Sequence, residues 1–172
     1  MQLCPSVLRA KPAIPELDFS GIIVQVGSDV PASRELRAGV PVFGSVLIGL
    51  HISAGVGALA EYIALPATSV VRKPENVSME KAAGFGVSGC TALVLMDGAK
   101  IQKGDKVLVN GASGGVGSIV VQFPKEAVGE EGKVVAMCSG RNVEMVKELG
   151  ADEVCISKST ECSHLVKNHI LI

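Results

Sequence analysis

The most constraining feature of this 172-residue chain is a glycine-rich segment that directly follows an apolar run. The run Lys106-Val-Leu-Val-Asn110 has the composition of a buried strand, and the next residues read Gly111-Ala-Ser-Gly-Gly-Val-Gly117. Apolar residues between Gly115 and Phe123 then fall on one helical face. Pro124 should end or kink that helix, because it clashes with the preceding turn. A strand, a glycine turn and a helix in this order predict the start of a parallel sheet.

The residues that follow continue the alternation of strand and helix. Lys133–Cys138 and Glu153–Ile156 are predicted strands, and the helix predicted over 143–149 between them stops at Gly150. The resulting β-α-β-α-β order is one half of a doubly wound α/β fold. The sixteen residues after Ile156 are too few for the second half, so we expect the strand over 106–110 to keep one unpaired edge.

The first part of the chain has short β elements and turns, followed by two helices. Alternating and β-branched patterns predict four strands and therefore a small barrel or sandwich lobe, and Ser78 is placed to cap the first helix. The organisation we expect is a β lobe over 1–76, bridging helices over 77–104 and an α/β domain over 105–172. The predicted strands are Phe19–Val26, Val40–Val46, Ala60–Leu65 and Ser69–Arg72, and the predicted helices are Met79–Ala83 and Thr91–Met96.

Charge and hydropathy exclude two classes of partner. Lys and Arg number 16 against 17 Asp and Glu, so the net charge of −1 provides no broad basic field for nucleic acid. The stretch Val40–Ala60 has no charged side chain and is long enough to raise the question of a membrane span. It contains Pro41, His51 and several glycines, so we interpret it as buried strands and glycine turns.

The cysteines and histidines indicate no metal site. No C-x-x-C pair occurs, which disfavours a zinc ribbon, a dithiol redox site or a dense disulfide framework. The odd number of cysteines and the lack of a leader-like start favour a reducing, cytoplasmic location, with most cysteines acting as small buried hydrophobes. The histidines show no base with an orienting partner. The residues concerned are Cys4, Cys90, Cys138, Cys155, Cys162, His51, His164 and His169.

The glycine segment has the spacing of a dinucleotide-binding loop. It fits G-x-G-x-x-G as Ala112-Ser113-Gly114-x-x-Gly117, with alanine at the first glycine position. Such a loop needs glycine where the backbone approaches a pyrophosphate and where helix and strand pack closely. The alternative is a tight turn of purely structural importance. The position between a predicted strand and a predicted helix favours dinucleotide binding.

The end of the second strand indicates which dinucleotide. A carboxylate there would bind the ribose 2′-hydroxyl of NAD, but the segment Ala136-Met-Cys-Ser-Gly-Arg-Asn142 contains none. The Ser139 hydroxyl and the planar guanidinium of Arg141 suit the 2′-phosphate of NADPH instead. The alternative is that Ser139 and Asn142 cap the next helix while Arg141 is solvated.

These segments together resemble the medium-chain dehydrogenase/reductase superfamily, in particular its zinc-free quinone oxidoreductase (zeta-crystallin-like) branch. The resemblance runs from about Lys11 to Ser157. It is carried by Lys11-Pro-Ala-Ile-Pro-Glu-Leu-Asp-Phe-Ser-Gly21, Val24-Gln-Val-Gly27, Gly57-Ala-Leu-Ala-Glu-Tyr62, Ala82-Ala-Gly84, Gly89-Cys-Thr-Ala92, Val107-Leu-Val-Asn-Gly-Ala-Ser-Gly-Gly-Val-Gly117 and Glu148-Leu-Gly-Ala-Asp152.

The resemblance implies a GroES-like lobe, here incomplete, followed by a partial Rossmann domain. It also implies hydride transfer from NADPH to a quinone, an enone or an enoyl acceptor, and an association into homodimers. Carried over by position, one group of residues would hold the pyrophosphate, a second the 2′-phosphate, and Thr91 would lie near the nicotinamide. The first group is Gly114, Gly115, Val116 and Gly117, and the second is Ser139 and Arg141.

The chain also departs from the family pattern. The usual Gly-Asp-Arg-Val turn reads Gly39-Val-Pro-Val42, and the Pro-Gly-x-Asp segment reads Pro15-Glu-Leu-Asp18. Family members have further strands before Met1 and after Ile172, so we expect a chain truncated at both ends. The alternatives are therefore an inactive remnant that binds cofactor or associates, and a zinc-type alcohol dehydrogenase-like protein. No catalytic residue is identified.

Overall fold

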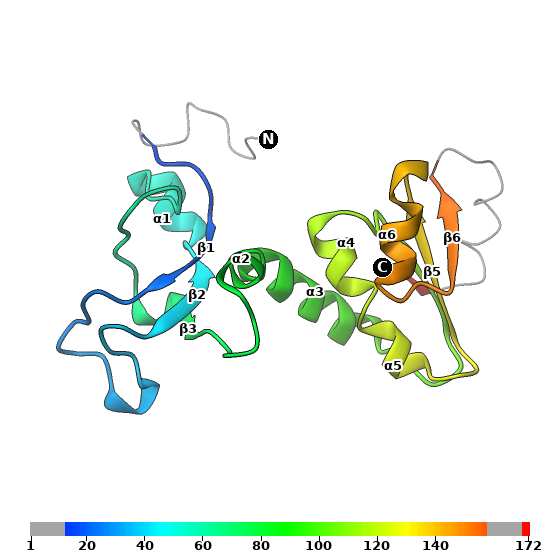
Figure 1. Cartoon of the computed structure of the whole chain (residues 1–172), viewed down its shortest axis with the longest axis horizontal. Helices are drawn as coiled ribbons and strands as arrows, with labels where there is room; N and C mark the ends of the chain where they lie inside the picture. Colours follow the sequence, from blue (N-terminus) through cyan, green and yellow to red (C-terminus); the bar gives the residue numbers. More distant parts are fainter. Residues whose placement is uncertain (1–12, 158–169) are drawn as a thin grey trace. The chain divides into compact units, whose positions relative to one another are not determined.

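The computed structural model describes residues 13–157 and 170–172 of the chain (Figure 1). It divides into two compact units, Met1–Val87 and Ser88–Ile172. The first contains an antiparallel sheet and the second a parallel sheet. The α/β fold class, with a partial GroES-like lobe followed by part of a Rossmann sheet, is thereby confirmed.

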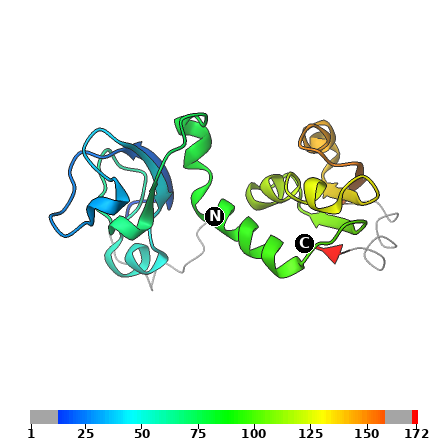
Figure 2. The same ribbon diagram turned by 90° about the horizontal axis from the view of Figure 1, so that it is seen from below.

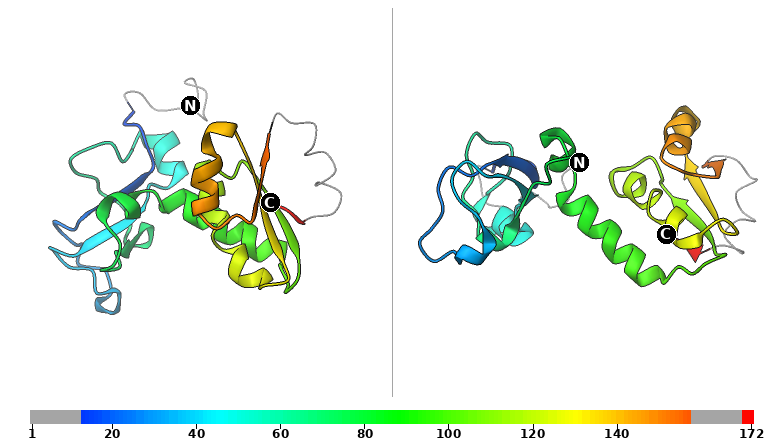
Figure 3. Two further views of the ribbon diagram at one scale, coloured as in Figure 1. Left: turned by 45° about the vertical axis from the view of Figure 1, so that its right-hand side comes forward. Right: turned by 60° about the horizontal axis from the view of Figure 1, so that its bottom comes forward.

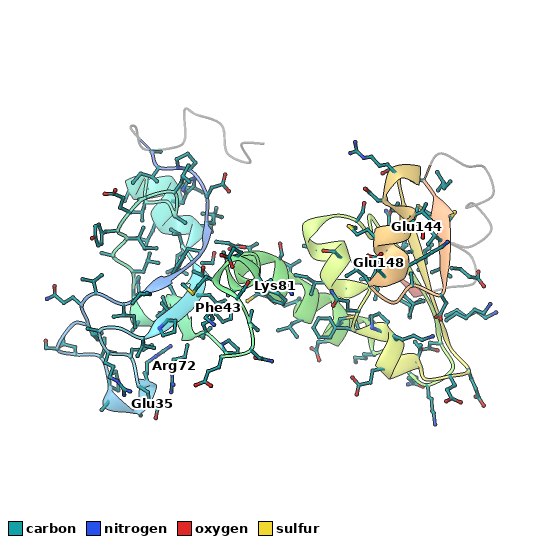
Figure 4. The ribbon with its side chains drawn as sticks, viewed as in Figure 1. Glu35, Phe43, Arg72, Lys81, Glu144 and Glu148 are labelled. Carbon is teal, nitrogen blue, oxygen red and sulfur yellow. The ribbon has the colours of Figure 1, made fainter. Side chains whose placement is uncertain are left out.

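The first unit is built on a three-stranded antiparallel sheet in the order β1-β2-β3. Gly44 in β2 has to be glycine, because a Cβ there would lie 2.1 Å from the Ser69 carbonyl oxygen. Arg72 at the end of β3 forms an ion pair with Glu35, and both side chains are labelled in Figure 4. The elements are β1 (Asp18–Ile22), η2 (Ala32–Arg34), β2 (Pro41–Ser45), α1 (Ile48–Ala54), η3 (Ala67–Ser69), β3 (Val70–Arg72) and α2 (Met79–Ala83).

Two expectations for this unit are wrong. The segment Ala60–Leu65 alternates in exposure only from Tyr62 to Leu65 and pairs with no strand of the described chain, so the alternating sequence pattern alone does not make it a strand. Within Val40–Ala60, which we interpreted as strands and turns, β2 is followed by the helix α1. That helix ends where Gly55 adopts a left-handed conformation (φ +68°) and its amide binds the His51 carbonyl, a geometry that glycine favours.

Helix α3 (Gly86–Ala99) is continuous and begins well before the predicted start at Thr91 (Figure 3). Its first turn is capped by the Asp18 carboxylate, whose two oxygens accept from the Val87 amide at 2.8 and 2.9 Å. The start must be glycine, because a Cβ on Gly86 would lie 2.4 Å from the Asp18 carboxylate. A residue 69 positions earlier therefore sets where α3 begins.

The second unit contains a four-stranded sheet in the order β6-β5-β4-β7, and its pairs are parallel. Pro124 separates α4 from α5, as expected from its missing amide hydrogen, and becomes the first residue of α5. The elements are β4 (Lys106–Asn110), α4 (Gly115–Val120), α5 (Pro124–Val128), β5 (Lys133–Cys138), η4 (Gly140–Asn142), α6 (Val143–Glu148), β6 (Glu153–Ile156) and β7 (Ile170–Leu171).

The expectation of an unpaired edge at Lys106–Asn110 is wrong. Strand β7, which appears as the red arrow in Figure 2, pairs in parallel with Val107 and Leu108 of β4. The Asn110 amide also donates to the Ile172 carbonyl at 2.8 Å. The chain between β6 and β7 is long enough for a parallel crossover, which needs about a dozen residues. Strand β4 is therefore an interior strand of the sheet.

The core of the second unit is aliphatic and lies on both faces of the sheet. One cluster joins alternate residues of β4 and β5 to α3, α4, α5 and α6, with Val109, Val120, Val134 and Val146 essentially inaccessible. The other face carries a smaller cluster of Leu108, Val135 and Cys155. This packing fixes the two strands from which the glycine segment and the Ser139 segment emerge.

The cysteines differ from one another in state. Cys90 is free and exposed, Cys138 is free and buried, and Cys155 is disulfide-bonded. The disulfide is a finding that the expectation of a reducing compartment did not include, while Cys4 and Cys162 lie outside the described residues. None of the helices described is long and apolar enough to cross a membrane.

Candidate functional site

The glycine segment forms a tight loop at the carboxyl end of β4. Gly111 has a left-handed backbone (φ +68°), and the Gly114 amide donates back to the Gly111 carbonyl at 2.9 Å. A Cβ on Gly117 would lie 2.2 Å from that same carbonyl oxygen, so only glycine lets α4 pack this closely on the turn. The Ala112 amide donates to the Met137 carbonyl at 3.0 Å and ties the loop to the end of β5.

A pocket of about 220 Å³ lies beside this loop. That volume is smaller than the usual site for a drug-sized ligand, so it would hold only part of a dinucleotide. Its wall is aliphatic except for the loop backbone and Asn110. The lining residues are Leu95, Val109, Asn110, Gly111, Gly114, Val116, Gly117, Val120 and Ile172.

Helix α3 lies against the glycine loop on the face that carries Thr91. A Cβ built on Gly115 would lie 3.2 Å from the Ser88 hydroxyl, and Leu95 lines the pocket together with Gly114. Positions 88, 91 and 95 share one face of a helix, so Thr91 lies on the face turned to the loop. Its role near a nicotinamide remains a prediction, and its half-buried side chain has interaction partners.

Three polar side chains meet where the β4 and β5 loops come together. The Asn142 side-chain amide donates to the Ser113 hydroxyl at 2.9 Å and to the Ser139 hydroxyl at 3.1 Å. Neither Ser139 nor Asn142 makes a side-chain capping bond to the helices that they precede. The geometry therefore does not support the alternative in which these two side chains only cap the next helix.

Arg141 is exposed beside this group, and in the described part of the chain its guanidinium has no hydrogen bond or ion pair. The neighbouring acidic side chains belong to α6, where Figure 4 labels Glu144 and Glu148. Lys147 pairs with Glu144 at 3.5 Å, which leaves the Arg141 charge uncompensated. An exposed guanidinium in the short turn that follows Ser139, without an ion pair in the described chain, is suited to binding an anion.

Two ionisable groups near the sheet are held in one state by their surroundings. Burial raises the pKa of the Cys138 thiol, directly before Ser139, so this cysteine stays protonated and unreactive at neutral pH. Burial also favours a raised pKa for Asp152, but hydrogen bonds from Lys125 and from the Val134 amide, together with nearby lysine charges, lower it overall.

The described residues contain no group of three or more His, Cys, Asp or Glu side chains that could hold a metal ion. His51 has Nδ1 at 2.9 Å from the Val56 carbonyl oxygen, in the turn after α1. This contact occupies one ring nitrogen with the backbone, and His51 itself lies in α1 and not in a turn. His164 and His169 lie outside the described residues.

The residues present fit a dinucleotide with a 2′-phosphate. Glycine occupies positions of the loop where side chains would collide with the backbone, and the loop leaves the carboxyl end of an interior strand. The loop after β5 presents Ser139, Arg141 and Asn142 and no carboxylate. The predicted cofactor residues thus lie together in the loop after β4 and the first turn of α4, and the loop is tied to the loop after β5; they are Ala112, Ser113, Gly114, Gly115, Val116 and Gly117.

Sequence reasoning had assigned Asn142 only to the alternative of a helix cap. Its contact with Ser113 joins residues 29 positions apart, across two loops. The clue in the sequence is that both residues directly follow the carboxyl ends of neighbouring parallel strands, which meet at one edge of the sheet.

Known proteins resemble the chain along most of its length. The sequence profile of the alcohol dehydrogenase GroES-like domain matches residues 3–75. The chloroplast envelope quinone oxidoreductase homolog of Arabidopsis thaliana is 39% identical over 163 residues, which are 91% of this chain and 46% of that protein. The NADPH-dependent alkenal/one oxidoreductase of the same plant is 35% identical over 142 residues, or 82% of this chain and 36% of that protein.

A solved structure shows the same arrangement of elements. The quinone oxidoreductase of Coxiella burnetii superposes with a TM-score of 0.72 at 29% identity, over 90% of this chain and 46% of that protein. The chain thus spans less than half the length of these relatives. The glycine loop, the GroES-like match and these likenesses agree in pointing to the quinone oxidoreductase-like branch of the medium-chain dehydrogenase/reductase superfamily, which the chain resembles over 82–91% of its length.

Proposed function

We propose that the second unit binds NADPH and that the protein is an oxidoreductase that transfers hydride from NADPH to a quinone, enone or enoyl acceptor. The observation that carries the proposal is the pairing of two loops at the carboxyl ends of β4 and β5. One loop has glycine where the backbone must approach its neighbours, and the other presents the Ser139 hydroxyl and the Arg141 guanidinium without a carboxylate.

Each group in this arrangement has a separate task. The backbone of Gly114–Gly117 would lie against the pyrophosphate, and Ser139 and Arg141 would bind the 2′-phosphate. NADPH, when bound, would supply the hydride, while the chain binds and orients it. Thr91, on the loop-facing side of α3, would lie near the nicotinamide. The names of the Arabidopsis relatives, a quinone oxidoreductase homolog and an alkenal/one oxidoreductase, support an activated double bond or quinone as acceptor.

The test is a calorimetric titration of the folded chain with NADPH and with NADH. We expect tight binding of NADPH and weaker binding of NADH. Arg141→Ala should weaken NADPH binding about tenfold or more, as for the loss of one bond to a charged group, and leave NADH nearly unchanged. Arg37→Ala is the control, because Arg37 is an exposed arginine of the first unit. Equal affinities for the two cofactors would contradict the assignment.

An acceptor screen follows from a positive titration. NADPH oxidation should depend on an added naphthoquinone or an α,β-unsaturated carbonyl compound. Binding without acceptor-dependent turnover would favour the second candidate, a cofactor-binding protein without catalysis. Association through an open edge of β4 is not proposed, because β7 pairs with that edge. Homodimer formation stays a prediction that sedimentation of the same sample would test.

A further inference from the structure

Among the residues that the structure describes, the side chain of Asn142 joins the two cofactor loops by hydrogen bonds. Its amide nitrogen lies 2.9 Å from the hydroxyl oxygen of Ser113, in the glycine loop, and 3.1 Å from that of Ser139, in the loop after β5. Asn142 and Ser113 are half-buried, and Ser139 is exposed. The backbone supports the same arrangement, because the Asn142 amide also donates to the Ser139 carbonyl at 2.9 Å.

The direction of these two hydrogen bonds matters for what the serines can bind. A side-chain amide nitrogen only donates, so both hydroxyl oxygens accept from Asn142. Each serine hydrogen is then directed elsewhere and remains able to donate. Asn142 thus converts two freely rotating hydroxyls into two oriented donors, and donors are what a phosphate requires.

We propose that Asn142 is a positioning residue that selects for the 2′-phosphate of NADPH by fixing the hydroxyls of Ser113 and Ser139 as donors. This inference rests on the proposed NADPH binding and adds a residue and a mechanism to it. Asn142 acts through the serines and Arg141, which contact the phosphate. Because NADH lacks that phosphate, the effect of Asn142 falls on one cofactor and not on the other.

A purely structural role for Asn142 makes a different prediction. Its side chain forms no capping bond to α6. If Asn142 only held the two loops together, its loss would disturb the pyrophosphate loop and weaken NADPH and NADH equally. The ratio of the two affinities is therefore the readout that separates positioning from support.

The experiment titrates the full chain and its variants with NADPH, NADH and the fragments 2′,5′-ADP and 5′-AMP. Asn142→Ala should weaken NADPH and 2′,5′-ADP about five- to tenfold and change NADH and 5′-AMP less than twofold, as for the partial loss of bonds to a charged group. Asn142→Asp should weaken NADPH more, because a carboxylate accepts from both serines and repels the phosphate.

Serine variants provide the matched control and a second route to the answer. Ser113→Ala should reproduce the selective loss, whereas Ser118→Ala should not, because the Ser118 hydroxyl donates to the Gly115 carbonyl within α4. The double variant of Ser113 and Asn142 should lose less than the product of the single losses, because both act through one contact. Circular dichroism of every variant verifies folding, and the serine variants carry the test if Asn142→Ala unfolds.

The outcomes are distinct. Equal weakening of NADPH and NADH by Asn142→Ala, or no weakening at all, would overturn the positioning role and leave NADPH binding intact. Independent, multiplicative losses in the double variant would also overturn it. If the wild-type chain binds neither cofactor, the proposed function and the role of Asn142 fall together.

Discussion

The two units of this protein are stabilised by different means. Of the described residues that form the buried apolar core, only Val42, Val46 and Ala82 belong to the first unit, and all the others belong to the second. The first unit depends on polar ties between segments far apart in the sequence, such as Asp18 to Val87 and Ser20 to the Met79 carbonyl. The second is a packed sheet of aliphatic side chains. Polar ties are directional and few, whereas packing is spread over many contacts.

The prediction with the largest expected effect tests how much packing stabilises the second unit. Leu108→Ala removes a side chain with no exposed surface from the contact with Val135 and Cys155, so it should lower the free energy of unfolding by about 2–5 kcal/mol. Leu93→Ala, at a position 58% exposed on α3, should change it by less than about 0.5 kcal/mol. Hydrogen exchange followed by mass spectrometry would locate the loss. If amide hydrogen exchange became faster only in the first unit, the contrast between a packed second unit and a first unit held by polar contacts would be contradicted.

A smaller effect tests the polar ties. Asp18→Ala removes the two hydrogen bonds that the Val87 amide donates to the Asp18 carboxylate and should lower the free energy of unfolding by about 1.5–3 kcal/mol, because the acceptor is charged. The expected readout is faster amide exchange at the start of α3 and in β1, with the second sheet unchanged. Asp29→Ala is the control, since Asp29 accepts only from the neighbouring Ser28 hydroxyl and is exposed. If Asp18→Ala and Asp29→Ala lower the free energy of unfolding equally, the hydrogen bonds between Asp18 and Val87 stabilise the protein no more than an exposed surface contact does.

A third prediction concerns strain in the first unit. Glu16 has a left-handed backbone (φ +65°), which is unfavourable for a residue with a Cβ. Glu16→Gly should therefore raise the melting temperature, with a gain of about 1 kcal/mol after the added flexibility of the unfolded chain is subtracted. Glu75→Gly, at a turn position without a positive φ, should lower it. A melting temperature lowered by both changes would show that Glu16 has a compensating contact.

The smallest effect concerns the polar tie of the second unit. The folded-state pKa of Asp152 lies below its ordinary value of 3.8, so its contribution is complete above that pH and is lost as the pH falls through the folded value. Asp152→Asn should therefore lower stability at neutral pH and flatten the dependence of stability on pH below about pH 4. Urea unfolding at several pH values measures this. An unchanged pH dependence would mean that the ion pair with Lys125 contributes nothing measurable.

The same contrast explains what the sequence could reveal. In the second unit the strands 106–110, 133–138 and 153–156 were predicted with their observed bounds, because buried aliphatic runs and a glycine turn are local signals. The start of α3 could not be predicted, because it depends on Asp18. Strand β7 was missed, because two residues carry no periodicity.

For the candidate site too, local features could be predicted from the sequence, and contacts between distant segments could not. The glycine loop and the neighbourhood of Ser139 and Arg141 follow from spacing after a strand. The bond from Asn142 to Ser113 does not, because it depends on how two loops meet after the sheet has formed. Short-range patterns therefore located the site, and tertiary contacts determine how its hydroxyls are oriented.

The pairing of β7 beside the pocket has a kinetic consequence. In the part of the chain that the structure describes, two ladder pairs and the hydrogen bonds of Ile172 to Leu108 and Asn110 hold β7 to β4, against five ladder pairs between β4 and β5, so β7 should separate from β4 more often than β5 does. Ile172 is also a wall of the pocket beside the glycine loop. Each detachment would release the Asn110 amide and open that wall. The rate at which a ligand enters the pocket would then be set by local separation of two strands, and not by rotation of a side chain.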